Sequence, residues 1–447
     1  MDNLPNPAQS TTDQEIKPEA PGSLAQPDIR EAVQAWAKIG VLSFGGPAAQ
    51  IALMHKVIVE EKRWLTEQQY LNALSFCMLL PGPEAMQLAT YAGWRLHGII
   101  GGLIAGLLFV LPGAAVVLTL SIIYALFGNV PFVEALFFGV KAAVFVIIIE
   151  ALLRIAKKAL HQKSHWLIAG LSFVAIFFLS LPFPLIILAA AIFGYLKTDR
   201  NLLSETATLP HKGFRNSVKT LTVWLVIWFT PLLAVMAYFG NNHLLTELGW
   251  FFSKLAVVTF GGAYAVLAYM GQDVVELRGW LEAGQMLDGL GLAETTPGPL
   301  ILVTQFVGFL AAFQHAGGSP LLMGLAGTLI ALWATFAPCF LFIFVGAPYI
   351  EWIIAQPRLK GALNAIIAAV VGVILNLAIW FALHVFFKTV TKTESGPFTL
   401  WQPDLSTIDL SALALACLSA YLLLYRHWPI AATLTASASI ALAKSGR

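Results

Sequence analysis

The sequence predicts an all-α polytopic membrane protein with two inverted-topology repeats of broken or re-entrant half-helices, joined by a linking transmembrane helix. The first observation is composition: of 447 residues, 58% are hydrophobic and 11% are charged, whereas soluble globular proteins carry about 25% charged residues. The second is that the apolar runs are long and continuous, unlike the alternating ten-residue segments of a membrane barrel. The third is a pair of helix-breaking motifs that occurs twice.

The two copies of these motifs keep an identical spacing. Three landmark pairs are each 216 residues apart: Phe44 and Phe260, Trp64 and Trp280, and Pro81 and Pro297. No residue has been gained or lost between the landmarks, so the chain contains an internal duplication. Gly and Pro break helices and free backbone groups, which a membrane protein tolerates only where they are buried in protein or face a water-filled cavity.

Composition and motifs exclude several classes of function. The three cysteines, Cys77, Cys339 and Cys417, lie scattered in apolar runs and match no disulfide framework or metal motif. Neither a nucleotide-binding Gly-x-x-x-x-Gly-Lys loop nor a Ser-His-Asp elbow occurs. We therefore expect no catalytic residue, no cofactor and no bound metal, and the protein is predicted not to be an enzyme. The net charge of +2 suggests no nucleic-acid partner.

The chain begins with a predicted disordered tail over 1–28, which is rich in proline and acidic residues and lacks a signal-peptide pattern. The first repeat is predicted over 29–197. Its expected elements are broken segments interrupted at 45–47 and 81–83, spans at 99–127 and 131–153, and a hairpin at 166–196 that turns at 181–184.

A basic cytoplasmic loop and a linking transmembrane helix at 221–240 are predicted within 198–244. The second repeat is predicted over 245–447. Its expected elements are broken segments at 247–271 and 281–310, spans at 320–346 and 361–387, and shorter spans at 408–425 and 429–443.

Charge in the loops predicts the orientation of the repeats. Loops 154–165 and 197–219 contain four and five Lys or Arg residues, which places them in the cytoplasm. The acidic segment 273–282 then falls outside, although its counterpart in the first repeat falls inside, so the second repeat is inverted. In such repeats half-helix ends meet near the membrane midplane, and their N-termini suit an anion.

Lys38 and Lys254 occupy matching positions, six residues before each Phe-Gly-Gly break. They either face an anionic substrate or snorkel to an interface. The hydroxyls of Ser43 and Thr259 either donate to a substrate oxygen or bond back to their own helices.

The two Pro-Gly-Pro motifs open the second half-helices, where glycine lets backbone approach a ligand closely. A plain structural kink is the alternative. The candidate substrate-binding residues are Lys38, Ser43, Phe44, Gly45, Gly46, Pro81, Gly82, Pro83, Gln87, Lys254, Thr259, Phe260, Gly261, Gly262, Thr296, Pro297, Gly298 and Pro299.

Four further ionisable residues are candidates for function. Glu84 and Glu294 lie beside the Pro-Gly-Pro breaks and are candidates for proton coupling, although the helix dipole alone could explain Glu84. Lys141 lies inside a predicted span, where it is either functional or paired with Glu134 or Glu150. Arg95 is either a vestibule cation for anions or a positive-inside anchor.

These motifs together resemble the chromate ion transporter family in its long two-domain form. The resemblance rests on Ser43-Phe44-Gly45-Gly46-Pro47, Glu60-x-Lys62-x-Trp64-Leu65, Pro81-Gly82-Pro83 with Gln87, Phe260-Gly261-Gly262-Ala263-Tyr264 and Pro297-Gly298-Pro299. It covers about 30–440. The second copy departs from the first in having Ala263 where the first has Pro47.

The resemblance implies export of chromate across the bacterial inner (plasma) membrane, driven by protons, with sulfate as the expected competitor. The expected partners are therefore chromate, sulfate, protons and the lipid bilayer, and a homodimer stays open. A sulfate importer, a transporter of another oxyanion and a passive anion channel are the alternatives.

Overall fold

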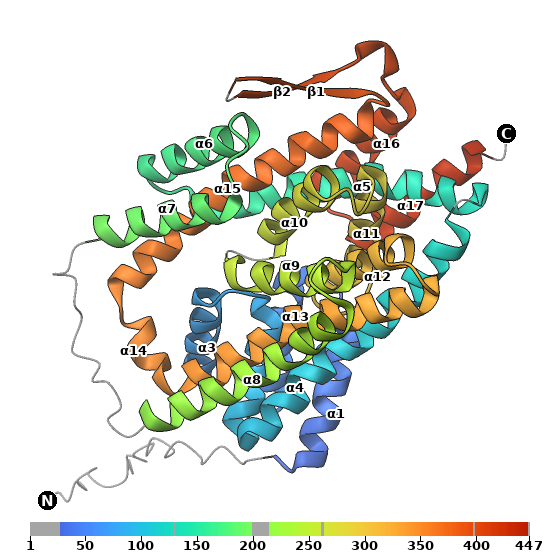
Figure 1. Cartoon of the computed structure of the whole chain (residues 1–447). Helices are drawn as coiled ribbons and strands as arrows, with labels where there is room; N and C mark the ends of the chain where they lie inside the picture. Colours follow the sequence, from blue (N-terminus) through green and yellow to red (C-terminus); the bar gives the residue numbers. More distant parts are fainter. Residues whose placement is uncertain (1–26, 129, 199–213, 261–262, 397, 446–447) are drawn as a thin grey trace, which may run out of the picture.

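The computed structural model describes residues 27–128, 130–198, 214–260, 263–396 and 398–445. Almost all of the predicted tail, most of the basic loop, and Gly261 and Gly262 lie outside the described residues. The expectation of an all-α protein is confirmed except for one two-stranded hairpin (Figure 1).

The first half of the chain contains both predicted breaks. Its elements are α1 (Ile29–Leu42), α2 (Gly46–His55), the π-helical turn η1 (Lys56–Glu61), α3 (Glu67–Leu79), α4 (Glu84–Phe127), α5 (Pro131–Ala159), α6 (Lys163–Phe177) and α7 (Phe183–Lys197). His97 and Gly98 leave helical geometry inside α4 and divide a half-helix from the long span that follows. The predicted hairpin turn at 181–184 is confirmed between α6 and α7.

After α8 (Phe214–Phe239), the second half repeats the same beginning. Its elements are α9 (Leu244–Val258), α10 (Ala263–Gln272), η3 (Asp273–Leu277), α11 (Ala283–Thr295), η4 (Leu300–Leu302), α12 (Val303–His315), α13 (Pro320–Gly346), η5 (Ala347–Tyr349), α14 (Ile350–Ile354), α15 (Pro357–Phe386), η6 (Leu405–Thr407), α16 (Leu410–Ala420), η7 (Tyr421–Tyr425) and α17 (Ile430–Ser445).

Five helical stretches among the described residues are long and apolar enough to cross a membrane, so this is a multi-pass membrane protein. They are 84–127, 131–159, 216–239, 320–354 and 357–386. Apolar helices of 10–17 residues, such as α6 and α7, accompany them. The division into repeats and the inversion of the second stay predictions.

The local structure around the two tryptophans is the same in both halves. A π-helical turn precedes each, and the N–H groups of Trp64 and Trp280 donate to Ile58 and Val274 at 2.8 and 2.9 Å. Capping boxes then start α3 and α11 at equivalent positions. The 216-residue spacing in sequence is therefore also a match in backbone hydrogen bonding.

Helices of the two halves pack against one another. Helix α15 of the second half lies against α5, α6 and α7 of the first, and α13 packs on both α4 and α12 (Figure 1). Small residues allow this close approach: a Cβ on Gly194 of α7 would lie 2.3 Å from the carbonyl oxygen of Gly361 in α15.

A hairpin of β1 (Val390–Ser395) and β2 (Phe398–Pro403), at the top of Figure 1, follows α15 and is not predicted from the sequence. Strand-favouring residues such as Phe398 and Trp401 are present, but the run is short and follows a long helix. The hairpin is attached to the α6–α7 turn, because Thr399 N–H donates to the Phe178 carbonyl at 2.7 Å.

Candidate functional site

The two Pro-Gly-Pro loops are each bonded to the Phe-Gly-Gly break of the other half. Gly82 N–H donates to the Thr259 carbonyl at 2.9 Å, and Gly298 N–H donates to the Ser43 carbonyl at 2.8 Å. Gly82 and Gly298 are 216 residues apart, and so are Ser43 and Thr259, so the two bonds are reciprocal. The four helix breaks thus meet in one region, as the sequence analysis predicts.

Glycine is required at the centre of both loops. Gly82 and Gly298 have φ values of +110° and +91°, which side chains rarely adopt. A Cβ on Gly82 would lie 3.1 Å from Cys339 Sγ in α13, and one on Gly298 would lie 3.2 Å from the Cα of Gly113 in α4. Each loop is therefore wedged between a helix break and a long helix of the other half.

Gln50 of α2 links the first break to the second loop, and the sequence analysis did not single it out. Its Nε2 donates to the Gly298 carbonyl at 2.6 Å and to the Ser43 carbonyl at 3.3 Å. The side chain is 1% exposed. A buried amide three residues after the Gly-Gly-Pro break was the available signal, because buried amides require partners.

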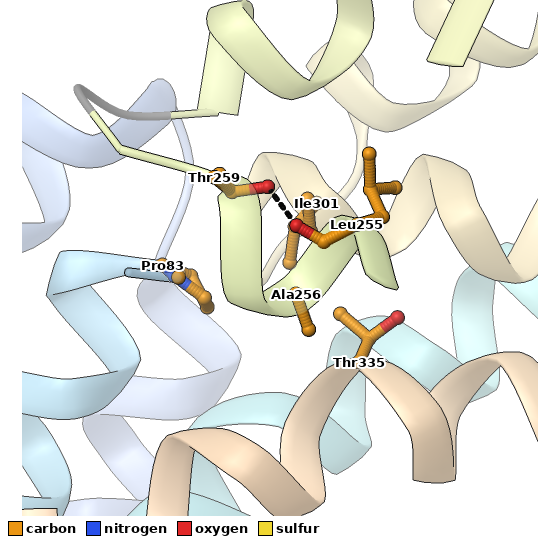
Figure 2. A pocket seen from close by; sticks show the side chains of 7 residues that line it. Pro83, Leu255, Ala256, Thr259, Ile301 and Thr335 are labelled. Atoms are coloured by element: carbon orange, nitrogen blue, oxygen red, sulfur yellow. Dashed lines mark hydrogen bonds between the residues drawn. The ribbon is translucent and has the colours of Figure 1, made fainter. Parts of the chain in front are cut away.

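A small pocket lies at the other loop, where residues of both halves meet. It is lined by Gly82, Pro83, Leu255, Ala256, Thr259, Ile301 and Thr335. Figure 2 shows Pro83 opposite Ala256, Thr259 and Ile301. Its volume of about 10 Å³ suits about one water molecule. A tetrahedral oxyanion does not fit in a space of this size.

The hydroxyls of Ser43 and Thr259 donate hydrogen bonds back to their own helices, which is one of the two roles expected for them. Ser43 Oγ donates to the Ile39 carbonyl at 2.6 Å, and Thr259 Oγ1 donates to the Leu255 carbonyl (Figure 2). Both bonds run four residues back along the helix. They hold the helix ends, while the backbone carbonyls of the same residues accept the loop bonds.

Neither candidate lysine lines the pocket. Lys38 has a 59% exposed side chain and lies 3.9 Å from Glu61 Oε2. Lys254 is exposed, with Nζ 5.9 Å from the ring centroid of Tyr269. Both lysines, which occupy matching positions in the sequence, therefore lie at accessible surfaces in this conformation.

The other predicted residues occupy three kinds of environment. Phe44 is 49% exposed, and Gly45, with φ +84°, precedes an accessible α2 N-terminus. Gln87 is buried, and its Nε2 closes its own loop by donating to the Pro81 carbonyl at 2.6 Å. Thr296 is buried and its hydroxyl donates to the Ala293 carbonyl at 3.3 Å.

Lys141 pairs with Asp288 of α11 rather than with Glu134 or Glu150. Its Nζ lies 3.2 Å from Asp288 Oδ2, and Tyr124 Oη donates to the same oxygen at 2.8 Å. The Asp288 side chain is 4% exposed and that of Lys141 is 28% exposed. Asp288 is not among the residues predicted from the sequence, although an ionisable residue in an apolar segment was a signal for function.

Of the carboxylates predicted for proton coupling, Glu294 is the more deeply buried. It is 8% exposed, and Tyr264 Oη donates to its Oε1 at 2.8 Å. Glu84 is partly buried at the start of α4, and Arg95 is exposed. Within the described ranges, no group of three or more His, Cys, Asp or Glu residues is placed to hold a metal ion.

The comparison with known families decides the identity of the chain. The family model described as Chromate transporter matches residues 30–195 and 246–442. The chain belongs to the chromate transporter family. The family resemblance that the motifs predict is confirmed. The model matches this chromate transporter family member in two separate segments, one in each half of the chain.

Relatives named for chromate transport support the same assignment. The Chromate transport protein of Cupriavidus metallidurans is 31% identical over 79% of this chain and 82% of its own length. The Probable chromate transport protein of Synechococcus elongatus is 30% identical, over 77% and 82%. The Chromate transport protein of Pseudomonas aeruginosa is 31% identical, over 75% and 77%. No solved structure matches this family member.

Proposed function

We propose that the protein is a secondary active transporter that exports chromate, a tetrahedral oxyanion, across the bacterial inner membrane in exchange for protons, giving chromate resistance. The substrate class comes from the family and from the names of the relatives. Proton coupling and the outward direction are part of the proposal, as are sulfate as competitor and the cytoplasmic placement of the basic loops.

The observation that carries the proposal is the reciprocal pair of bonds from Gly82 to Thr259 and from Gly298 to Ser43. Such reciprocity is what a two-fold relation between two repeats would produce. Inverted repeats whose broken helices meet at their interface are a common architecture of secondary transporters. The substrate would lie among these breaks once the halves rock apart, bound by backbone N–H groups of the glycines.

Lys38 and Lys254 would supply positive charge in the open conformation. Lys38 would first have to leave Glu61, and Lys254 would leave the face of Tyr269. Both side chains are long and exposed, so their movement does not require the core to repack.

The closed pocket favours a carrier over a passive channel. The pocket beside Gly82 has space for about one water in this conformation, which is too little for an oxyanion. A carrier must close around its site between its two open states, whereas a channel conducts through one open pore. A channel would give flux that protons cannot drive uphill.

The test is uptake of labelled chromate into inverted vesicles under an imposed pH gradient. We expect uptake that depends on the gradient and is reduced by sulfate, and absence of both properties would contradict the proposal. Counter-flow against a panel of oxyanions in proteoliposomes then ranks the substrates. Lys38→Ala and Lys254→Ala should weaken the apparent affinity at least tenfold, and unchanged affinity in both variants would remove the lysines from the site.

A further inference from the structure

Helix α11 holds two carboxylates in the same unusual setting. Asp288 Oδ2 accepts from Tyr124 Oη, and Glu294 Oε1 accepts from Tyr264 Oη, each at 2.8 Å. The second oxygens, Asp288 Oδ1 and Glu294 Oε2, are buried and have no hydrogen-bond partner among the described residues. The two residues are 3% and 8% exposed.

A buried carboxylate with one open oxygen is suited to binding a proton. Nearly all buried polar atoms have a hydrogen-bond partner, so each open oxygen marks a place for a water or a proton. An ionised carboxylate in an apolar interior is costly, and binding a proton relieves that cost. The tyrosine hydroxyls and Lys141 stabilise the ionised forms, so that both protonation states are supported.

Charged groups of α5 accompany the two carboxylates of α11, and we call this set of charged groups the seam. Lys141 lies against Asp288, while Arg154 and Glu150, paired with each other, act electrostatically on Glu294. Glu282, at the start of α11, acts on Tyr124. The carboxylates are six residues apart, roughly 9 Å along the helix.

Helices α5 and α11 touch closely between the two carboxylates. A Cβ on Gly291 would lie 2.2 Å from Val140 Cγ1. The seam is therefore held by packing as well as by charge.

The two carboxylates are separate from the pocket and belong to the second half. Neither carboxylate lines the pocket beside Gly82. The positions 216 residues earlier hold Asn72 and Met78, which do not titrate. If these two positions served only the structure that both halves share, a carboxylate would not be needed in one half alone.

We propose that Asp288 and Glu294 of α11 bind the coupling protons of the transporter. A proton that binds Asp288 forms an O–H bond and dissolves the ion pair with Lys141. A proton that binds Glu294 forms an O–H bond at its open oxygen, Oε2. This rests on the proposed proton coupling, and it adds Asp288 and two positioning tyrosines while choosing Glu294 over Glu84.

The test compares Asp288→Asn and Glu294→Gln with the wild type in proteoliposomes containing a trapped pH-sensitive dye. Chromate counter-flow at equal pH moves no net proton, and we expect it within about threefold of wild type. Chromate-linked proton flux should fall at least tenfold. Asn72→Ala and Met78→Ala are the matched controls from the first half and should retain both activities.

The tyrosines provide a second measurement that does not remove a carboxylate. Tyr124→Phe and Tyr264→Phe should move the pH midpoint of net transport upward, because the phenyl ring no longer donates to the ionised group. Should either carboxylate variant fail to fold, unchanged midpoints in the tyrosine variants overturn the inference.

Two results in folded carboxylate variants also overturn it: retained proton flux, or equal loss of counter-flow and proton flux. If wild-type transport itself ignores the pH gradient, the proposed function fails first, which distinguishes the two failures.

Discussion

Replacing Gly113 with alanine tests whether the second Pro-Gly-Pro loop is wedged against α4. A Cβ at this position would lie 2.2 Å from the Pro297 carbonyl oxygen and 2.8 Å from Leu302 Cδ1. Real Cβ contacts are essentially never closer than 3.0 Å, so the loop or the helix must move by about 0.8 Å. Backbone carbonyls do not swing aside as a side chain does.

The magnitude follows from three contributions. Overpacking of this kind costs about 1–3 kcal/mol. The shift also weakens the adjacent bond from Gly298 N–H to the Ser43 carbonyl, which contributes about 1 kcal/mol. Because alanine has a higher helix propensity than glycine, the substitution also stabilises α4 by about 1 kcal/mol. We expect a net destabilisation of about 1–3 kcal/mol.

The assay combines thermal unfolding of the detergent-solubilised protein with chromate counter-flow. Gly113→Ala should lower Tm and reduce counter-flow at least tenfold. The matched control is Gly170→Ala in α6, where a Cβ meets nothing within 4 Å, so Tm should stay equal or rise. If Gly113→Ala has the same Tm and counter-flow as the wild type, the close packing of the second Pro-Gly-Pro loop against α4 is refuted.

Three further predictions concern side chains that the structure connects. Gln50→Leu should cost about 1–3 kcal/mol, because the buried Gly298 carbonyl loses its side-chain donor and the Ser43 carbonyl keeps only the Gly298 N–H; an unchanged Tm would contradict a stabilising role of Gln50. Lys141→Ala should cost about 3–5 kcal/mol by leaving Asp288 unpaired, and adding Asp288→Asn should recover part of that loss; strict additivity would contradict the pair. The hydrogen bond to Glu67 raises the pKa of His55, so the stability it gives is full below about pH 6.5 and is lost as pH rises through the raised pKa; the Tm difference between wild type and His55→Gln should shrink toward high pH.

The sequence predicted the parts of the site that depend on local backbone chemistry. Gly82 and Gly298 could be located because few other residues adopt their φ values. The environments of Lys38 and Lys254 could not be predicted, since exposure depends on how each helix is rotated against neighbours far away in sequence. The Lys141–Asp288 pair joins residues 147 positions apart, and no local pattern specifies such a contact.

The duplication has kept backbone geometry while the charges have diverged. The reciprocal bonds at the breaks and the turns at Trp64 and Trp280 match between the halves. By contrast, the buried acidic side chains of the described residues all lie in the second half: Asp273, Asp288 and Glu294. Their counterparts in the first half are Val57, Asn72 and Met78. Two halves with equal titratable groups would respond to a proton equally from either side. Because the buried acids of the described residues lie in the second half alone, protonation changes the charge inside that half and not inside the other.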